Sequence, residues 1–402
     1  MEFETTRDGR MRVRPAIYLA VLALLVILSV ACKQGGNTTP EASPGGITMH
    51  RADPARTGVY RTEGPTEYTN IKWQFAADDW VFGAPAILGD RAWFTSYDGY
   101  VYAVDSTTGA EVWRFDSGNT IIAAAAVANN IVYIGNMSGT VFALDSATGK
   151  ELWRVEVGTR SADAPVGFSG SPAVIDGVVY FANENGTLIA LDANSGEEKW
   201  RFEKPGFAMP FSPAVADGVV YIPVSNGILY AIDAATGKEL WNYNPTVENN
   251  LYIPTSDAVV KNGLVFYMTN DLNLTGVLYA VDINAQKLRW RLQTATENYS
   301  PPAISDDGIA IWGGLDGALH AASVETGDIL WDFPTDEIIF SAPAIAGDTV
   351  YFGGNDKNLY ALDYKTGQQR WQFRAESAVS SPAILDGVVF VGTEDGTVFA
   401  LQ

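Results

Sequence analysis

Side chains able to perform acid–base, thiol or metal chemistry are few in this sequence. Its 402 residues include one cysteine, Cys32, and two histidines, His50 and His320. The histidines lie far apart along the chain, and His320 stands where another repeat has a strand aromatic, Tyr360, so structural roles are favoured for both. The sequence carries no glycine-rich phosphate loop and no spacing typical of metal ligands. It therefore predicts no catalytic, cofactor-binding or metal-binding residues.

Cys32 ends an apolar run near the N-terminus. Arg12 and Arg14 precede the run from Ala16 to Val30, which is typical of a secretory signal. The end of the run, Leu28-Ser-Val-Ala-Cys32, resembles a bacterial lipoprotein signal, although Ser29 replaces the usual larger aliphatic residue. The resemblance implies cleavage before Cys32 and lipidation of its thiol. A plain signal peptide or a single membrane anchor is the alternative, and a start at Met11 instead of Met1 is a further hypothesis.

Three segments follow from this pattern. Residues 1–31 are predicted to be a signal peptide of the lipoprotein type. Residues 32–46 would form the lipidated cysteine and a flexible tether, because this stretch has almost nothing to bury. Residues 47–402 contain the repeats. The protein is then expected outside the cytoplasm and anchored to a membrane: the outer membrane, facing the periplasm, if the host has one, and otherwise the outer leaflet of the plasma membrane.

A spine of Ala-x-Asp-x-x-x-Gly-x-x-x-Trp recurs along the rest of the chain, as in Asp363, Gly367 and Trp371. The aspartate can accept N–H bonds from the turn that it begins, and the glycine provides a positive φ. Two copies are degenerate, with Gln286 in place of the glycine and Ser323 in place of the aspartate. Eight tryptophans, mostly 40 or 41 residues apart, are predicted to wedge between neighbouring repeats: Trp73, Trp113, Trp153, Trp200, Trp241, Trp290, Trp331 and Trp371.

Each repeat reads as four short strands joined by tight turns. A small, proline-rich entry strand such as Ser212-Pro-Ala-Val215 precedes three longer strands, of which the last carries the tryptophan. The final repeat stops at Gln402 before its fourth strand, and residues 71–75 can provide it. The predicted fold is therefore all-β: an eight-bladed β-propeller of four-stranded antiparallel blades, with the ring closed by strand 71–75 pairing with the C-terminal blade.

This pattern resembles the PQQ-type β-propeller family over residues 47–402. With the lipoprotein-like signal, it is most similar to the lipoproteins of the outer-membrane β-barrel assembly machinery, whose propeller is a non-enzymatic scaffold that binds a membrane barrel protein. The other branch, the quinoprotein dehydrogenases, uses PQQ with calcium over the propeller axis. Those enzymes share a vicinal cysteine pair, which this sequence lacks. A scaffold is thus favoured over a PQQ-dependent oxidoreductase and over a ligand-binding or sensory propeller.

The formal charge of −21 restricts the classes of partner. Such a surface repels nucleic acid and anionic headgroups and favours cationic partners, or simply solubility. A protein partner, the membrane reached through Cys32, and a monomeric propeller are expected.

Two insertions indicate one face as a candidate interface. Trp153 and Trp200 are 47 residues apart and Trp241 and Trp290 are 49 apart, and the extra residues fall in loops that share one face of a meander. Residues on these and neighbouring loops could bind a partner: Trp80, Arg160, Phe168, Phe207, Met209, Phe211, Tyr252 and Tyr299. Phe82 belongs to the same group of aromatics. The alternative is that many of these side chains fill the axial funnel or pack the loops.

Overall fold

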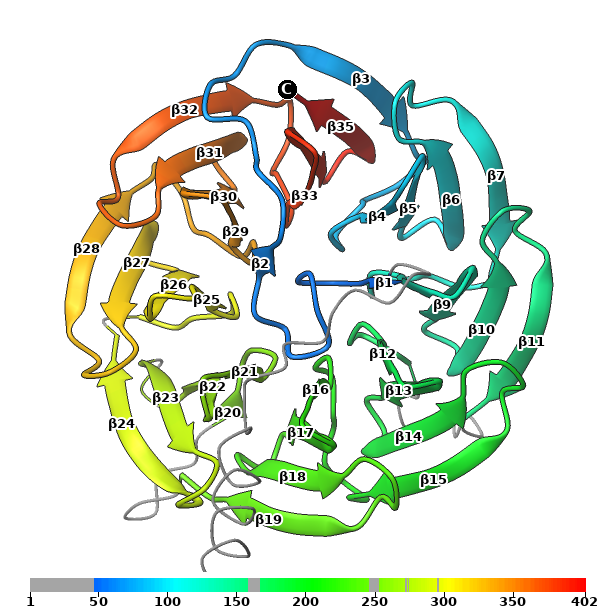
Figure 1. Ribbon diagram of the computed structural model, residues 1–402, viewed down its shortest axis with the longest axis vertical. Coiled ribbons are helices and arrows are strands. Elements are labelled where there is room, and N and C mark those ends of the chain that lie inside the picture. Colours follow the sequence, from blue (N-terminus) through cyan, green and yellow to red (C-terminus); the bar gives the residue numbers. More distant parts are fainter. Residues whose placement is uncertain (1–46, 158–166, 246–252, 272, 274, 295) are drawn as a thin grey trace, which may run out of the picture. The chain divides into compact units, whose positions relative to one another are not determined.

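The computed structural model describes residues 47–157, 167–245, 253–271, 273, 275–294 and 296–402. These residues form 35 short strands in eight sheets that stand around a central axis (Figure 1). The eight-bladed propeller predicted from the sequence is thereby confirmed. No helix long and apolar enough to cross a membrane occurs in the described part of the chain.

The first four blades follow the chain in order. Blade 1 comprises β4 (Ala86–Leu88), β5 (Arg91–Thr95), β6 (Tyr100–Asp105) and β7 (Glu111–Asp116). Blade 2 comprises β8 (Ala126–Ala128), β9 (Ile131–Gly135), β10 (Thr140–Asp145) and β11 (Glu151–Glu156), with β1 (Ile47–Thr48) added beside β8. Blade 3 comprises β12 (Ala173–Ile175), β13 (Val178–Ala182), β14 (Thr187–Asp192) and β15 (Glu198–Glu203). Blade 4 comprises β16 (Ala214–Ala216), β17 (Val219–Pro223), β18 (Leu229–Asp233) and β19 (Glu239–Tyr243).

The remaining blades complete the circle. Blade 5 comprises β21 (Val259–Lys261), β22 (Leu264–Asn270), β23 (Gly276–Asp282) and β24 (Lys287–Gln293), with β20 (Ile253–Pro254) on the extended end of β22. Blade 6 comprises β25 (Ala303–Ile304), β26 (Ile309–Gly313), β27 (Ala318–Ser323) and β28 (Ile329–Pro334). Blade 7 comprises β29 (Ala344–Ala346), β30 (Thr349–Gly353), β31 (Asn358–Asp363) and β32 (Gln369–Arg374), with β2 (Val59–Tyr60) parallel to β29. Blade 8 comprises β33 (Ala383–Leu385), β34 (Val388–Gly392), β35 (Thr397–Leu401) and β3 (Ile71–Ala76).

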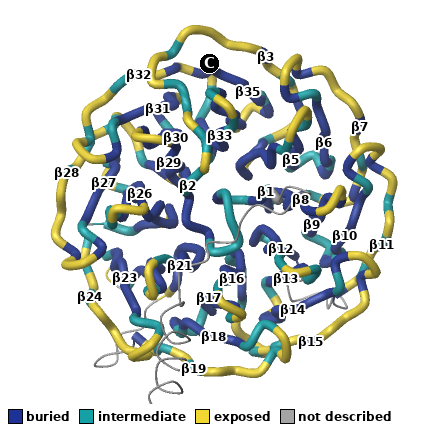
Figure 2. The backbone as a smooth tube through the Cα atoms, viewed as in Figure 1, coloured by how far each residue is buried: buried dark blue, intermediate teal, exposed yellow. Residues whose placement is uncertain are grey.

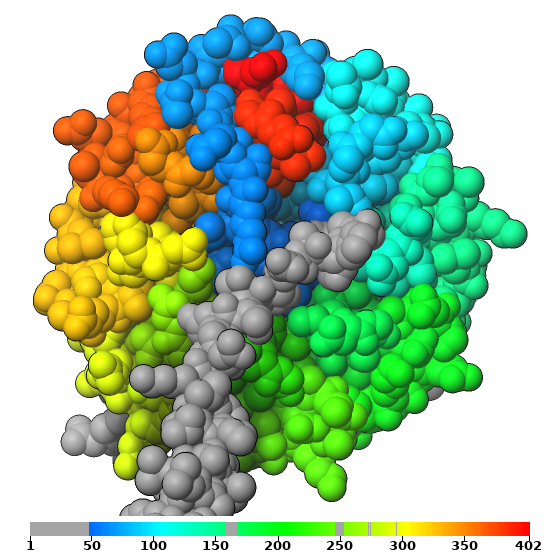
Figure 3. Space-filling view, viewed as in Figure 1, coloured from blue at the N-terminus to red at the C-terminus, as the bar shows by residue number. Residues whose placement is uncertain are grey.

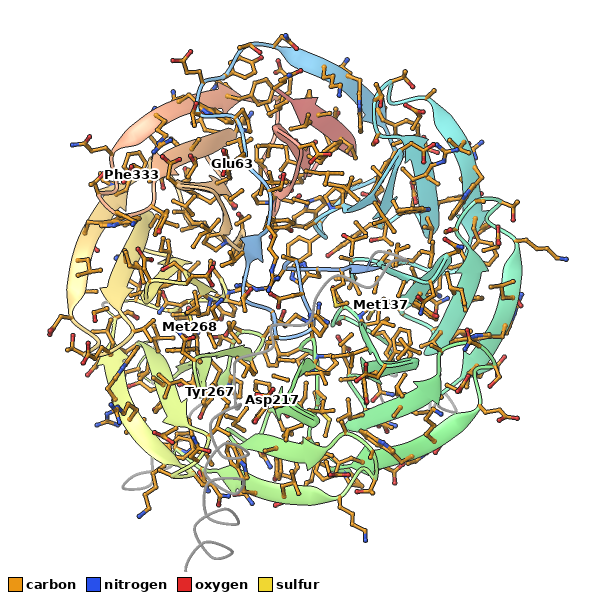
Figure 4. The ribbon with its side chains drawn as sticks, in the orientation of Figure 1. Glu63, Met137, Asp217, Tyr267, Met268 and Phe333 are labelled. Carbon is orange, nitrogen blue, oxygen red and sulfur yellow. The ribbon has the colours of Figure 1, made fainter. Side chains whose placement is uncertain are left out.

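The sequence of each strand matches its distance from the axis. Strands such as β9 and β30 are buried at every position and read as continuous apolar runs, because both of their faces pack against neighbouring blades. The outermost strands alternate instead, as β7 does, since they face solvent on one side. Figure 2 shows this gradient, with exposed residues concentrated on the outer strands. Contacts between blades combine aliphatic and aromatic side chains; Phe333 of β28, labelled in Figure 4, packs 5.6 Å from the Tyr360 ring of blade 7.

The repeated spine is a docking device between blades. In blade 1, the Asp105 carboxylate accepts the N–H groups of Thr107 and Thr108 at 2.9 and 2.8 Å, and Gly109 has a φ of +73°. A Cβ added to this glycine would lie 2.7 Å from the Trp73 ring of blade 8, so only glycine admits the indole. The indole Nε1–H donates to the carbonyl of Ser106 at 2.9 Å. The same Nε1–H to carbonyl bond recurs for Trp113, Trp153, Trp200, Trp290 and Trp331 on the next blade.

The two degenerate copies keep the geometry by other means. Gln286 adopts a φ of +53° in the glycine position. At the other copy, the Ser323 hydroxyl accepts the Thr326 N–H at 3.4 Å in place of a carboxylate.

The ring closes as predicted, by pairing its two ends. β3 is antiparallel to β35, with Trp73 opposite Ala400 and Phe75 opposite Val398. The preceding segment, residues 61–70, runs outward beside the C-terminal blade (Figure 3) and caps the last tryptophan. The Pro65 carbonyl accepts the Trp371 Nε1–H at 2.8 Å, a role that an Asp-Gly turn serves in other blades.

Candidate functional site at the propeller axis

Residues 47–60 cross the central axis and form what we call the plug (Figure 1). Its backbone pairs with β8 of blade 2 through β1 and with β29 of blade 7 through β2. Between these points its carbonyls accept one entry-strand N–H from each of blades 4, 5 and 6, as in Val215 to Pro54 at 2.7 Å and Val260 to Ala55 at 2.8 Å. The plug therefore supplies hydrogen-bond partners to inner strands that have no neighbour on the axial side.

Two buried arginines fasten the plug. Arg56 donates to the carbonyls of Ser171 and Pro172 at 2.8 and 2.9 Å, and Arg51 donates to that of Pro301 at 2.9 Å. Burial lowers the pKa of each arginine to about 10, so both stay protonated at neutral pH. The entry strands are rich in proline, which has no N–H, so some of their carbonyls find no donor nearby. The guanidinium group of an arginine has five N–H donors and can satisfy several of these carbonyls. Sequence reasoning missed Arg51 and Arg56, because a segment that occurs once has no repeat to reveal it.

A histidine and an aspartate lie next to the two arginines. His50 Nε2 is 3.7 Å from Asp257 Oδ2, and Asp257 Oδ1 accepts the Ser212 N–H at 2.8 Å. Burial, followed by the charges of Arg56 and Arg51, lowers the pKa of His50 well below its ordinary value, so the imidazole is neutral. Its Nδ1 has no hydrogen-bond partner. Asp257 replaces the proline that follows the serine in other entry strands, such as Pro172 and Pro213.

His50 and Asp257 both line a cavity of about 220 Å³, which we call the funnel. Its wall includes Thr255, which is only 6% exposed and whose hydroxyl has no partner. Serine hydroxyls link the blades behind the wall, since Ala124 N–H donates to Ser171 Oγ at 3.0 Å and Ser171 N–H to Ser212 Oγ at 2.9 Å. Aromatic rings also line the funnel: Phe82, Phe211, Tyr299 and Phe340.

The aromatic rings come from loops that join the fourth strand of one blade to the first strand of the next. Because the strands are antiparallel, these loops share a face with the turns between second and third strands, and we call it the funnel face. Phe82, Phe207, Tyr299 and Phe340 are exposed on it, whereas Trp80 and Phe211 are half-buried. Sequence reasoning missed Phe340, although its place before an entry strand is the same as that of Tyr299.

Two residues predicted to bind a partner are core residues instead. Phe168 and Met209 are fully buried, so the prediction is wrong for them. Phe168 packs 5.5 Å from the Phe181 ring, and Met209 belongs to the cluster between blades 3 and 4. Each of these apolar side chains packs against blade residues and is thereby shielded from water. Two other predicted residues, Arg160 and Tyr252, lie outside the described residues.

The remaining polar groups are structural. His320 stacks on Trp312, with ring centroids 5.4 Å apart, and its Nδ1 lies 2.7 Å from Asp332. A second cavity, of about 460 Å³, opens between blades 5 and 6 on the opposite face and is lined by Asp282, Asp306 and other polar side chains. No group of three His, Cys, Asp or Glu side chains placed to hold a metal ion occurs within the described ranges.

The quinoprotein resemblance implies PQQ, a flat quinone with three carboxylates, and calcium. The residues at the axis do not fit this group. The cationic side chains nearest the funnel, Arg51 and Arg56, are committed to main-chain carbonyls. Asp257 lines the funnel and is a side chain of the kind that binds calcium, but no lysine or arginine of the described chain lines the funnel to pair with the carboxylates of PQQ.

Comparison with known proteins agrees with this geometry. A family model described as outer membrane protein assembly factor BamB matches residues 97–311 and 274–402. A protein of the same name from Yersinia pestis is 26% identical over 164 residues, which make up 37% of this chain and 41% of that protein. The match thus spans less than half of this relative's length.

Solved structures share the fold. BamB from Moraxella catarrhalis has a TM-score of 0.67 and 20% identity, covering 83% of this chain and 97% of that one. Quinohemoprotein alcohol dehydrogenase from Comamonas testosteroni has a TM-score of 0.74 and 17% identity, covering 88% and 80%. Identities this low show the common propeller alone. The family model matches most of the chain, and the chain therefore belongs to the family described as outer membrane protein assembly factor BamB.

Proposed function

We propose that the protein is a non-enzymatic scaffold, tethered to a membrane, that binds a protein partner through the funnel face during assembly of outer-membrane proteins. Membership of the family supports the assembly role. One observation carries the docking role: exposed aromatic rings from four separate inter-blade loops, Phe82, Phe207, Tyr299 and Phe340, gather on one face. Aromatic residues are enriched at protein interfaces and at their energetic hot spots.

The chemistry of the axis supports a scaffold over an enzyme. His50 and Asp257 are the titratable pair nearest the funnel, but the histidine is held neutral beside two buried arginines and no hydroxyl or thiol nucleophile is bonded to it. Nucleophilic catalysis needs such a residue beside the base. Rigid entry strands fastened by the plug are suited to presenting loops in a fixed arrangement.

The membrane tether is part of the proposal. Lipidation of Cys32 would place the propeller beside a membrane, with residues 33–46 as a spacer. Mass spectrometry of the N-terminal peptide tests this. We expect the acylated Cys32 as the first residue, and the variant Cys32→Ala should leave the protein in the soluble fraction. An unmodified Cys32 in membrane-bound protein would refute the lipid anchor.

Affinity purification of the tagged full-length protein from crosslinked native envelopes tests the scaffold role. We expect a membrane β-barrel assembly subunit to be recovered, and its yield to fall at least several-fold in the variant Phe207→Ala/Phe340→Ala. The control variant Leu152→Ala/Leu240→Ala removes equally exposed apolar side chains from the outer strands β11 and β19. Equal recovery with both double variants would exclude docking on the funnel face. Recovery of electron-transport proteins alone would favour the oxidoreductase and call for PQQ and calcium titration.

A further inference from the structure

We infer that the funnel face takes a basic, extended segment of the partner, and that an aromatic side chain of this segment with a hydrogen-bonding group enters the funnel. This inference rests on the proposed scaffold function and specifies the chemistry of the partner. Its evidence is the charge of the loops around the funnel and the groups left without partners inside it.

Acidic side chains crowd one part of the funnel face. They lie on the loops and turns of blades 7, 8 and 1, which are consecutive around the ring, and we call them the acidic arc: Asp78, Asp79, Asp98, Asp336, Glu337, Asp356, Glu376, Glu394 and Asp395. Seven of the nine are exposed; Asp98 is half-buried and Asp356 is buried. No lysine or arginine of the described chain lies within ion-pair distance of any of them, although such pairs are common on the outer strands, as in Arg201 with Glu203 at 3.6 Å.

The loops of the acidic arc meet one another at the blade borders. The Asp78 N–H donates to Asp98 Oδ2 at 3.2 Å, and the Asp336 N–H to Asp356 Oδ2 at 3.4 Å. The carboxylates are therefore held close together by backbone bonds rather than by cations. Lys357 and Arg374 lie on the same turn and strand of blade 7, and Arg374 donates to the main-chain carbonyl of Asp356 at 3.4 Å. The acidic arc keeps an excess of negative charge, which a basic segment lying across it would complement.

The opposite side of the same face differs. Over blades 3 and 4, the charged side chains on the described parts of the funnel-face loops and turns include Glu184 and Lys204, and Lys204 is already paired with Glu239 at 3.2 Å. Charge thus favours a position over blades 7, 8 and 1 rather than over the described parts of blades 3 and 4. Two of the exposed aromatics, Phe82 and Phe340, stand on loops of the acidic arc itself. Apolar and acidic contacts are consequently available to one short segment of chain.

The funnel beside the acidic arc is suited to one side chain. Its volume of about 220 Å³ exceeds the roughly 30 Å³ share of a water molecule several-fold. Phe82, Phe211 and Phe340 line it with apolar surface, whereas Thr255 Oγ1 and His50 Nδ1 have no hydrogen-bond partner among the residues that the structure describes. Buried polar atoms normally find partners. A tyrosine would place its ring among the aromatics and its hydroxyl near these two atoms.

Peptide binding to the full-length protein in detergent tests the inference. The probe is a fluorescent, amidated peptide with one tyrosine between two lysine–arginine pairs, measured by anisotropy. We expect saturable binding that weakens about tenfold between low salt and 0.3 M NaCl, because screening removes the attraction of exposed charges. The triple variant Asp78→Asn/Glu337→Gln/Glu394→Gln should weaken binding about tenfold. The matched control, Asp176→Asn/Asp217→Asn/Glu197→Gln, removes three exposed carboxylates from the opposite face and should leave the affinity unchanged.

The funnel itself is tested by a pair of substitutions. Thr255→Val keeps the shape of the side chain and removes the unpartnered hydroxyl. It should weaken the tyrosine peptide several-fold and leave a phenylalanine peptide unchanged. Equal affinity of the acidic-arc variant and its control would overturn the inference, as would an effect of Thr255→Val on neither peptide. If the partner is still recovered from envelopes in that case, the scaffold function stands and only the chemistry assigned to its partner fails.

Discussion

Trp113 illustrates how much one side chain contributes to the stability of the propeller. It is 8% exposed, rests on Gly149 of the next blade, and donates its Nε1–H to Ser146 O at 3.0 Å. Trp113→Ala should lower the free energy of unfolding by about 3–5 kcal/mol, since both the buried ring and an inter-blade bond are lost. Denaturant unfolding measures this. The control is Leu152→Ala, because Leu152 is exposed and lies beside Trp153, the equivalent tryptophan of blade 2. Its free energy of unfolding should stay within about 0.5 kcal/mol of the wild-type value.

His50 makes stability depend on pH. Its folded-state pKa lies below the ordinary value of 6.5, so the unfolded chain takes up the proton first. The contribution to stability is complete above pH 6.5 and is lost as the pH falls through the window below it. The groups facing His50 are Arg51, Arg56 and Asp257. Thermal unfolding between pH 7.5 and 5 should show a smaller loss of Tm for His50→Gln than for wild type. Parallel curves would assign the pH dependence to other groups.

At the scale of the element, the repeat turn is where sequence predicts structure best. Asp105, Gly109 and Trp113 stand in a fixed local pattern, and each has its own physical requirement: an acceptor, a positive φ and an inter-blade contact. Because these requirements recur in every blade, the sequence pattern that meets them also recurs and can be recognised. Loop side chains carry no such signal. Phe168 and Phe207 are both aromatics before an entry strand, yet Phe168 is fully buried and Phe207 is 45% exposed.

The degenerate turn of blade 5 provides a test at this scale. Gln286 has a φ of +53°, a conformation that costs a non-glycine residue about 1–2 kcal/mol. Gln286→Gly should raise the free energy of unfolding by about 0.5–1 kcal/mol, after the greater freedom of glycine in the unfolded chain is subtracted. Gly149→Ala is the opposite change in an intact copy and should destabilise, since its Cβ would lie 2.6 Å from the Trp113 ring. Equilibrium unfolding of both variants gives the comparison.

For the whole molecule, the eight blades could be predicted by counting repeats, but the plug could not. Arg51 and Arg56 bind carbonyls of entry strands that are 115 to 251 residues away in the sequence. No residue spacing in the sequence predicts contacts of this kind. The acidic arc was equally hidden, because its carboxylates are scattered over the sequence between Asp78 and Asp395 and become neighbours only when the ring closes.

Removing an arginine of the plug should weaken the hydrogen bonds between the plug and the entry strands while the blades stay folded. In Arg56→Met, the amides of Val215 and Val260, which donate to Pro54 and Ala55, should exchange with deuterium about tenfold faster, because the buried carbonyls that lose their donors destabilise the bound plug. The amide of Ile189, inside blade 3, should keep its rate. Equal acceleration at all three positions would indicate global destabilisation instead.

The pairing of β3 with β35 also has a consequence for biosynthesis. Trp73 meets Ala400, so the ring cannot close until residues 397–401 have been synthesised and have reached β3. Until then an unpaired strand edge is exposed at each end of the growing propeller, and contacts this distant in sequence form slowly. A nascent chain stalled or cleaved before residue 397 would therefore be left as an open arc of blades, prone to aggregation and to proteolysis, so chains that lack β35 would be removed before they reach a partner.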